Sequence, residues 1–244
     1  MAQFGPIAPF YDQLMHSVPY DMWLEYYLLL LETRDQRPER ILDVCCGTGL
    51  LCEMMAKRGY DISGIDISAP MIDEAKRKAT ELDLQIAYLA QSAQDFRFEQ
   101  PFESAYSFFD SLNYITDLGE LKKAIQNVSD HLQPGSMFVF DLNTEYAFTQ
   151  KMFDQHDTRK KAQVKYDWKG DYDTRSRVIK VHMDFWVDGE HYVETHIQRA
   201  HTRDEMFELL IEADFDEITV FDSYTLDPPR KASDRVHYRA MKAE

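Results

Sequence analysis

From Glu39 to Leu142, short apolar runs alternate with segments whose apolar residues recur at helical spacing. The apolar runs, each typical of a buried strand, are "RILDVC", "DISGID", "QIAYLAQ", "ESAYSFFDS" and "SMFVFDL". The helical segments are "GLLCEMMAKRGY", "SAPMIDEAKRKATEL" and "LGELKKAIQNVSDHLQPG". We expect these helices to end at Gly59, to begin at Ser68 and to stop at Pro134-Gly135, respectively. Alternation of this kind predicts a parallel sheet covered by helices on both faces.

After Asn143 the pattern changes to one without helical period. The segments "QVKYDWK", "RSRVIKVHMDFWV" and "HYVETHIQRAHT" are separated by "GDYDT" and "DGE". Runs of β-branched and aromatic residues between short polar turns predict an antiparallel meander.

The register of this meander depends on the loop at Asp188-Gly189. A two-residue turn would place the alternating apolar residues Ile179, Val181, Met183, Phe185 and Val187 on the same face as Tyr192, Glu194 and His196. An odd-length loop would align them with Val193, Thr195 and Ile197 instead. We expect the odd loop, which leaves a polar, solvated face carrying His182, Asp184, Trp186, Tyr192, Glu194 and His196.

The chain then returns to the first pattern, with a helix in "RDEMFELLIEADF" and strands in "EITVFDSYTL" and "RVHYRAMK". We therefore expect an α/β protein with a doubly wound, seven-stranded, mostly parallel sheet. Residues 1–143 and 202–244 would form this domain, and residues 144–201 an inserted antiparallel β subdomain.

Charge and composition narrow the kind of partner. The chain has 43 acidic residues against 27 Lys and Arg, a formal charge of −16, whereas nucleic-acid binders usually carry a basic stripe. Residues 151–199 hold ten Lys and Arg and nine Asp and Glu, so the inserted segment adds no such stripe. The balance argues against a nucleic-acid partner and leaves the oligomeric state open.

The sequence shows no pattern typical of a secreted or membrane-spanning protein. The opening "MAQFGPIAPFYDQLM" has no signal-peptide pattern, and the apolar run "LEYYLLLLE" is too short to cross a bilayer. Three cysteines between positions 45 and 52 form no disulfide framework. We expect a soluble, cytoplasmic protein without membrane contact.

The turn "DVCCGTG" is the strongest candidate for ligand binding, because a small-residue turn between strand and helix lets a ligand approach the backbone. A dinucleotide motif would need Gly47-x-Gly49 followed by a third glycine, where Cys52 stands. The other register is Asp43-x-Cys45-x-Gly47-x-Gly49, an acid followed by small residues at every second position.

This second register resembles the first motif of the class I S-adenosylmethionine-dependent methyltransferases. "DVCCGTGLLCEMMAKRGYDISGIDISAPMIDEAKRKA" is similar to the family's first two motifs, and "QSAQDF", "FDSLNYI" and "HLQPGSMFVFDLN" to its later ones, across roughly residues 38–143. The opening "FYDQLM", with Tyr20 and Trp23, resembles a small-molecule subgroup with a β-rich insertion after the fifth strand. The resemblance implies a Rossmann-like fold and S-adenosylmethionine as cofactor.

The resemblance also implies roles for particular residues. Asp43 and the turn residues Cys45, Gly47 and Gly49 would receive the methionine portion, and Asp66 would accept both ribose hydroxyls. Ile67 and Met71 would pack on the adenine. The remaining implied cofactor-binding residues are Tyr11, Tyr20, Trp23, Ser92, Ala93 and Asp110, while Asn113 and Tyr114 would face the acceptor.

The resulting hypothesis is methyl transfer to a small-molecule acceptor by in-line displacement, with residues 144–201 as a lid and no general base assigned. The alternatives are a non-catalytic module that binds the cofactor or its demethylated product, and an RNA or protein methyltransferase. A nicotinamide-dependent dehydrogenase is the weakest. A redox role for Cys45 and Cys46 is a further alternative, and no metal is expected because no C-x-x-C pair completes a zinc site.

Overall fold

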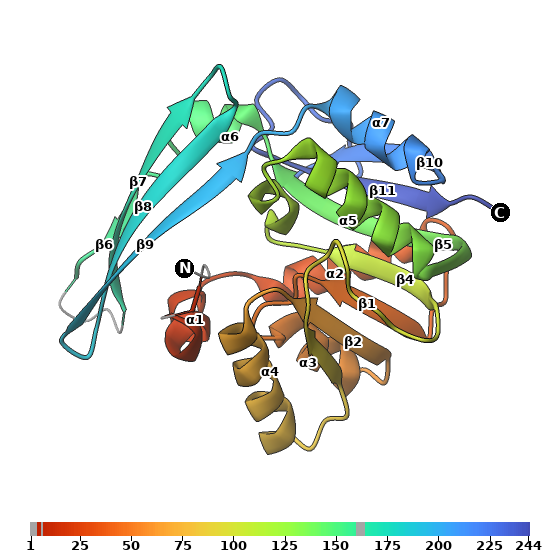
Figure 1. The fold of residues 1–244 in the computed structure, drawn as a ribbon, viewed down its shortest axis with the longest axis horizontal. Coiled ribbons are helices and arrows are strands. Elements are labelled where there is room, and N and C mark those ends of the chain that lie inside the picture. The colour runs from red at the N-terminus through yellow and green to blue at the C-terminus, as the bar shows by residue number, and fades with distance from the viewer. Residues whose placement is uncertain (1–3, 6, 160–163) are drawn as a thin grey trace.

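A seven-stranded sheet forms the centre of the protein, whose computed structural model describes residues 4–5, 7–159 and 164–244. Its strand order is β10-β11-β5-β4-β1-β2-β3 (Figure 1). The strands are β1 (Arg40–Val44), β2 (Asp61–Asp66), β3 (Ala87–Ala90), β4 (Phe102–Ser107), β5 (Leu132–Asn143), β10 (Phe215–Asp222) and β11 (Arg235–Lys242). Strand β11 alone runs antiparallel to its neighbours β5 and β10, while β1 to β5 are parallel. The predicted fold class is confirmed.

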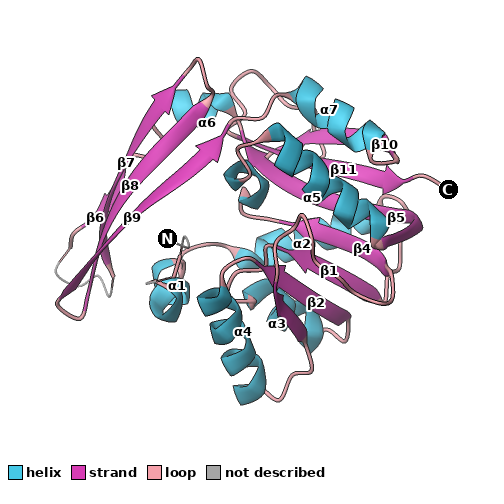
Figure 2. Ribbon diagram, viewed as in Figure 1, coloured by secondary structure: helices cyan, strands magenta, loops and turns pink. Residues whose placement is uncertain are grey.

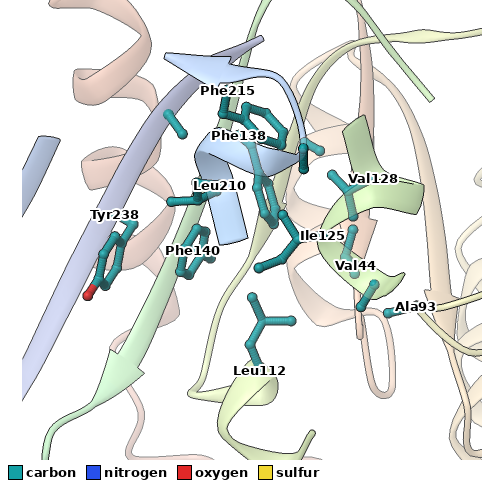
Figure 3. Packing of buried hydrophobic residues seen from close by; sticks show 14 of the residues in the cluster. Val44, Ala93, Leu112, Ile125, Val128, Phe138, Phe140, Leu210, Phe215 and Tyr238 are labelled. Carbon is teal, nitrogen blue, oxygen red and sulfur yellow. The ribbon is translucent and has the colours of Figure 1, made fainter. Parts of the chain in front are cut away.

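Helices cover both faces of this sheet (Figure 2). Helices α5 (Leu118–Asp130) and α7 (Arg203–Glu212) pack on one face, and α2 (Tyr20–Glu32), α3 (Leu50–Lys57) and α4 (Ala69–Glu81) on the other. Figure 3 shows the first of these two cores, in which Ile125 and Val128 of α5 and Leu210 of α7 face Phe138 and Phe140 of β5. Burial of these large apolar side chains on each side holds the sheet in place.

Helix ends are set by local polar groups. The Asp117 carboxylate accepts a hydrogen bond from the Glu120 N–H at 2.9 Å and so begins α5, while Thr202 and Glu205 form a reciprocal capping box at α7. Ser68 stands at the N-cap of α4, as predicted, but its hydroxyl makes no capping bond.

The predicted end of α5 at Pro134-Gly135 is wrong. The helix ends at Asp130, and both residues belong to β5. Phe102 of β4 pairs with Leu132 and Ser104 with Met137, so β5 carries extra residues between these pairs. Proline and glycine suit such an irregularity, because the missing N–H and the positive φ of Gly135 (+75°) cost nothing there.

The inserted segment forms a second, four-stranded antiparallel sheet, which stands as an arm beside the main domain (Figure 1). Its strands are β6 (Gln155–Asp157), β7 (Lys165–Asp173), β8 (Val178–Val187) and β9 (Glu190–Arg199). The predicted separator "GDYDT" is instead largely strand, and the turn falls at residues 174–177. Strand β6 and the short helix α6 (Glu145–Thr149) were not predicted, since each is too short to show a period.

The predicted odd-length loop between β8 and β9 is also wrong. Asp188 and Gly189 form a two-residue turn with φ of +51° and +89°, and Val187 pairs directly with Glu190. A two-residue turn with both φ values positive matches the twist of the strands, which is why Asp-Gly favours it. Met183 consequently lies opposite Glu194, and Val181 lies opposite His196.

This register moves Glu194 and His196 from the predicted solvated face to the buried, apolar face of the sheet. The His196 side chain is 2% exposed, whereas His182 remains exposed as predicted. The expectation that both histidines are solvated therefore holds only for His182.

Residues 7–14 lie between the two sheets. Ile7 precedes the 3₁₀ turn η1 (Ala8–Phe10), which is followed by helix α1 (Tyr11–Leu14). Together with Phe10 and Leu14 of these elements, it packs against apolar residues of β8 such as Phe185. Within the described part of the chain, no helix is long and apolar enough to cross a membrane.

Candidate functional site: two cavities that share a wall

The turn after β1 is built from left-handed residues. Cys45, Gly47 and Gly49 have φ of +65°, +55° and +76°. A left-handed conformation costs a non-glycine residue roughly 1–2 kcal/mol, which explains small residues at every second position and makes Cys45 the strained member. At position 49 a side chain would also clash with a neighbour, because a Cβ atom there would lie 2.3 Å from the Tyr88 hydroxyl.

Asp66, the last residue of β2, faces this turn. Its carboxylate accepts one hydrogen bond from the Gly47 N–H at 2.9 Å and another from the Ser68 N–H at 2.8 Å. Burial raises the pKa of Asp66, and these two backbone bonds oppose the rise. The arrangement joins the ends of β1 and β2 and fixes a carboxylate beside the turn.

Asp43 lies beneath the turn and is 3% exposed. Burial raises its pKa to about 7, while the hydrogen bond from the Cys52 thiol opposes the rise. The Cys52 thiol donates to the carboxylate at 3.3 Å. Asp43 therefore titrates near neutral pH and responds to any positive charge brought close to it.

The three thiols are held as neutral groups. Burial raises the pKa of Cys52 to about 11 and raises those of Cys45 and Cys46 as well. All three cysteines are free. A reactive cysteine needs a lowered pKa, so the redox alternative receives no support from the surroundings of these thiols.

A first cavity of about 150 Å³ opens above the turn. Most of the residues predicted to bind the cofactor lie in its wall, namely Tyr11, Tyr20, Trp23, Asp43, Cys45, Gly47, Asp66, Ile67 and Met71. Sequence reasoning did not single out Phe4, Thr48, Phe108, Phe109 and Ser111, which also line it. The wall thus combines carboxylates at the strand ends with an apolar and aromatic side.

Other predicted cofactor-binding residues lie outside the wall of this cavity. Ser92 donates its hydroxyl to Asp95 at 2.5 Å, Ala93 is buried in the core, and Gly49 is covered by Tyr88. Asp110 lines a second cavity instead.

This second cavity, of about 350 Å³, lies between the inserted sheet, the N-terminal residues and the main domain. The two cavities share Phe4, Tyr11, Phe109 and Tyr114 as a common wall. Further aromatic residues that line the second cavity are Phe153, Tyr166, Trp168 and Phe185. The polar residues in its lining include Asp110, Asn143, Gln155, His196, Gln198, Asp234 and Arg235.

A chain of buried hydrogen bonds ends at the common wall. The Tyr114 hydroxyl lies 3.0 Å from His196 Nδ1, and His196 Nε2 lies 2.6 Å from Glu194 Oε2. Burial raises the pKa of Tyr114, with Asp110 as the next cause. Tyr114, which the sequence predicts to face the acceptor, lines both cavities. The sequence does not predict Glu194 and His196 at this wall, because the wrong hairpin register turns both toward solvent.

A second buried cluster surrounds Asp110. Arg235 forms ion pairs with Asp110, at 2.8 Å, and with Asp141. The Gln198 amide donates to the other oxygen of Asp110 at 2.6 Å. Arg235 comes from β11, far along the chain, so no local pattern could connect it to Asp110.

Asn113, predicted to contact the acceptor, lines neither cavity. Its side-chain amide donates to the carbonyls of Asn143, at 3.1 Å, and Arg199, at 2.8 Å, and its oxygen accepts from the Asn143 N–H at 3.0 Å. The fully buried side chain therefore joins the turn η2 (Ser111–Tyr114) to the points where the chain leaves β5 and β9.

The N-terminal residues are attached to the turn by a polar contact. The Thr48 hydroxyl donates to Asp12 Oδ1 at 2.5 Å, and Lys78 of α4 lies 2.6 Å from Asp12 Oδ2. This contact holds Tyr11 over the first cavity.

Comparison with known proteins shows what this chain is similar to. The family model described as a methyltransferase domain matches residues 41–135. The chain is 28% identical, over 98% of its own length and 99% of the relative's, to a protein of Geobacillus sp. (strain WCH70) named as a methyltransferase.

Solved structures extend the match over the whole chain. A S-adenosylmethionine-dependent methyltransferase from Clostridium acetobutylicum superposes with a TM-score of 0.87, at 24% identity over 100% of both chains. The amino pentose methyltransferase CalS10 from Micromonospora echinaspora, solved with S-adenosylmethionine bound, has a TM-score of 0.76 at 17% identity, over 100% of this chain and 99% of that one. These identities show the common fold.

Together these findings show a methyltransferase domain over residues 41–135, on a fold shared with S-adenosylmethionine-dependent methyltransferases. The residues at the turn fit S-adenosylmethionine. A half-buried carboxylate, Asp66, stands beside a turn whose backbone is open at Gly47, and apolar side chains form the opposite wall.

Proposed function

We propose that this enzyme methylates a small molecule that binds in the second cavity. The observation that carries the proposal is the wall shared by the two cavities, formed by Phe4, Tyr11, Phe109 and Tyr114. A cofactor in the first cavity and an acceptor in the second would meet at this wall. Methyl transfer needs the two reacting atoms held close and in line, so adjoining cavities suit it.

In this proposal the residues of the first cavity hold the cofactor. Asp66 accepts the ribose hydroxyls, Asp43 and the turn at Cys45 and Gly47 receive the amino-acid end, and Ile67 and Met71 cover the adenine. When bound, S-adenosylmethionine supplies an electrophilic methyl group for in-line displacement by the acceptor.

The inserted segment, residues 144–201, acts in this proposal as the lid that shapes the acceptor cavity. Phe185 of β8 and His196 of β9 line that cavity, opposite Asp110 of the main domain. The enclosed setting and the acidic charge of the chain favour a small acceptor over RNA or protein. The amino pentose acceptor of CalS10 is of the size that such a cavity suits.

Calorimetric titration tests the cofactor half of the proposal. S-Adenosylmethionine and S-adenosylhomocysteine should bind the wild-type protein and NAD should not. Asp66→Ala should weaken binding roughly ten- to a hundred-fold, because a charge-assisted hydrogen bond contributes about 1.5–3 kcal/mol. Asp61→Ala, at the exposed start of the same strand, is the matched control and should bind normally.

Labelled methyl transfer tests the acceptor half. The protein is incubated with methyl-labelled S-adenosylmethionine and, separately, with small-molecule, RNA and protein fractions of a cell extract. We expect label in the small-molecule fraction. Label confined to RNA or protein would contradict the proposed acceptor class, and no transfer to any fraction would leave only cofactor binding.

A further inference from the structure

The hydrogen bonds around the second cavity point their donors away from the cavity and leave acceptor oxygens facing it. A carboxylate can only accept hydrogen bonds, so the Glu194 carboxylate requires a proton on His196 Nε2, which lies 2.6 Å away. In a neutral imidazole, Nδ1 is then an acceptor, and the Tyr114 hydroxyl at 3.0 Å must donate to it. The Tyr114 oxygen therefore presents only lone pairs to its remaining neighbours, and Tyr114 lines both cavities.

The hydrogen bond between Gln198 and Asp110 also leaves an acceptor oxygen without a donor. The Asp110 carboxylate accepts a hydrogen bond from Gln198 Nε2 at 2.6 Å, which fixes the orientation of that amide. Gln198 Oε1 is buried and has no hydrogen-bond partner among the described residues. Gln198 is 1% exposed and lines the cavity, so a ligand there that carries an N–H or O–H would supply a donor for this oxygen.

The charges at the cavity are acidic in sum. Among the residues that the structure describes, the charged ones in its lining, apart from His196, are Asp110, Asp234 and Arg235. Arg235 is shared between Asp110 and a further buried carboxylate, Asp141, so its positive charge is already matched. Glu194 adds another buried carboxylate behind His196.

Aromatic residues form a large part of the remaining lining, with Tyr11, Phe109, Tyr166, Trp168 and Phe185 among them. Aromatic faces attract cations. The Trp168 indole N–H is buried without a partner among the described residues, so a ligand that carries an acceptor, such as a hydroxyl, would satisfy it.

We propose that the second cavity recognises an amine in its protonated form, attached to an apolar body that also carries a hydroxyl. Unpartnered acceptors, excess carboxylate and aromatic walls all match an ammonium group, which has three donors and no acceptor. This inference rests on the proposed function, because it names the class of acceptor for that same site. The bound ammonium has no lone pair, so it first gives up one proton, to a carboxylate of the lining or to solvent. The free amine then attacks the methyl group, S-adenosylhomocysteine leaves, and the product is a methylammonium.

Three matched probes test the proposal by calorimetry at pH 7.5, with the protein saturated with S-adenosylhomocysteine. They are 2-amino-1-phenylethanol, 1-phenylethane-1,2-diol and mandelate, which share a phenyl ring and a hydroxyl and differ in a cationic, neutral or anionic end. We expect the amine to bind roughly ten- to a hundred-fold more tightly than the diol, and mandelate not to bind.

Two variants and one control locate the effect. Gln198→Met and Tyr114→Phe each remove one acceptor at nearly constant volume and should reduce the preference for the amine over the diol. His182→Gln, on the exposed face of the same sheet, should leave it unchanged. Far-ultraviolet circular dichroism and thermal unfolding show that each variant is folded. S-Adenosylhomocysteine affinity is a second check for Gln198→Met and His182→Gln, whose side chains do not line the first cavity.

Binding of the diol or of mandelate as tightly as the amine would overturn the proposal. So would failure of all three probes to bind while S-adenosylhomocysteine binds normally. Failure of S-adenosylhomocysteine itself to bind the wild-type protein would instead remove the proposed function, and this inference with it.

Discussion

Asn113 offers the sharpest test of what the structure adds to the sequence, because the two assign it different roles. The sequence places it near the acceptor, whereas the structure buries it completely as a clamp with three hydrogen bonds to the backbone of Asn143 and Arg199. Replacing it with alanine removes these bonds and leaves buried backbone groups without partners.

The loss of stability in Asn113→Ala can be estimated from the hydrogen bonds that it removes. Each buried hydrogen bond contributes about 1 kcal/mol net, and an unpaired buried partner adds to the loss. Asn113→Ala should therefore lower the free energy of unfolding by about 2–4 kcal/mol. For a chain of this size the melting temperature should fall by roughly 5–15 °C.

Urea and thermal unfolding, followed by circular dichroism, measure this change. Gln150→Ala, at an exposed position, is the control and should change stability by less than about 0.5 kcal/mol. At a temperature where Asn113→Ala is folded, its affinity for S-adenosylhomocysteine should equal that of the wild type, because the side chain lines neither cavity. A normal stability combined with a lost ligand affinity would refute the clamp and restore the role inferred from the sequence.

Three further predictions concern the turn, a buried histidine and the thiols. Gly49→Ala should destabilise the protein by more than Gly59→Ala, because both positions have a positive φ but only at Gly49 would the new Cβ atom contact Tyr88. Urea unfolding of the two variants measures the difference. Equal losses of stability would contradict the steric argument. Burial lowers the pKa of His237 to about 3, so the unfolded chain takes up a proton below about pH 6.5 that the folded chain refuses. Stability should accordingly fall by about 2 kcal/mol from pH 7.5 to pH 5 through this residue, and His237→Gln should show a shallower fall; parallel pH profiles would count against it. Finally, a pKa of about 11 leaves the Cys52 thiol roughly a hundred-fold less ionised at pH 7.5 than a free cysteine. Iodoacetamide should therefore modify the folded protein slowly, as followed by mass spectrometry. Rapid modification would support the redox alternative.

The proposed lid and its acceptor cavity depend on a single two-residue turn. Asp-Gly is the strongest short signal for a tight hairpin, and it was present in the sequence. The odd loop was preferred because it kept Glu194 and His196 away from the apolar face. Side chains alternate along a strand, so this one choice moved every polar residue of β9 to the wrong side.

Local patterns determined a large part of this protein. The alternation of strands and helices, the position of the turn at Cys45 and Gly47, and Asp66 at the end of β2 could all be predicted, because each depends on neighbours in the chain. Backbone conformation at a turn restricts residue type directly, and apolar periodicity reports which face is buried.

Only the tertiary structure decided what the second cavity contains. Asp110 meets Arg235 from β11 and Gln198 from β9, and Tyr114 meets His196, across 82 to 125 positions of sequence. No local pattern encodes such contacts, because they arise where strands from distant parts of the chain are brought to one edge of the sheet. The sequence thus determined the fold and indicated the cofactor, and the packing of the inserted sheet against the main domain determined which polar groups surround the second cavity.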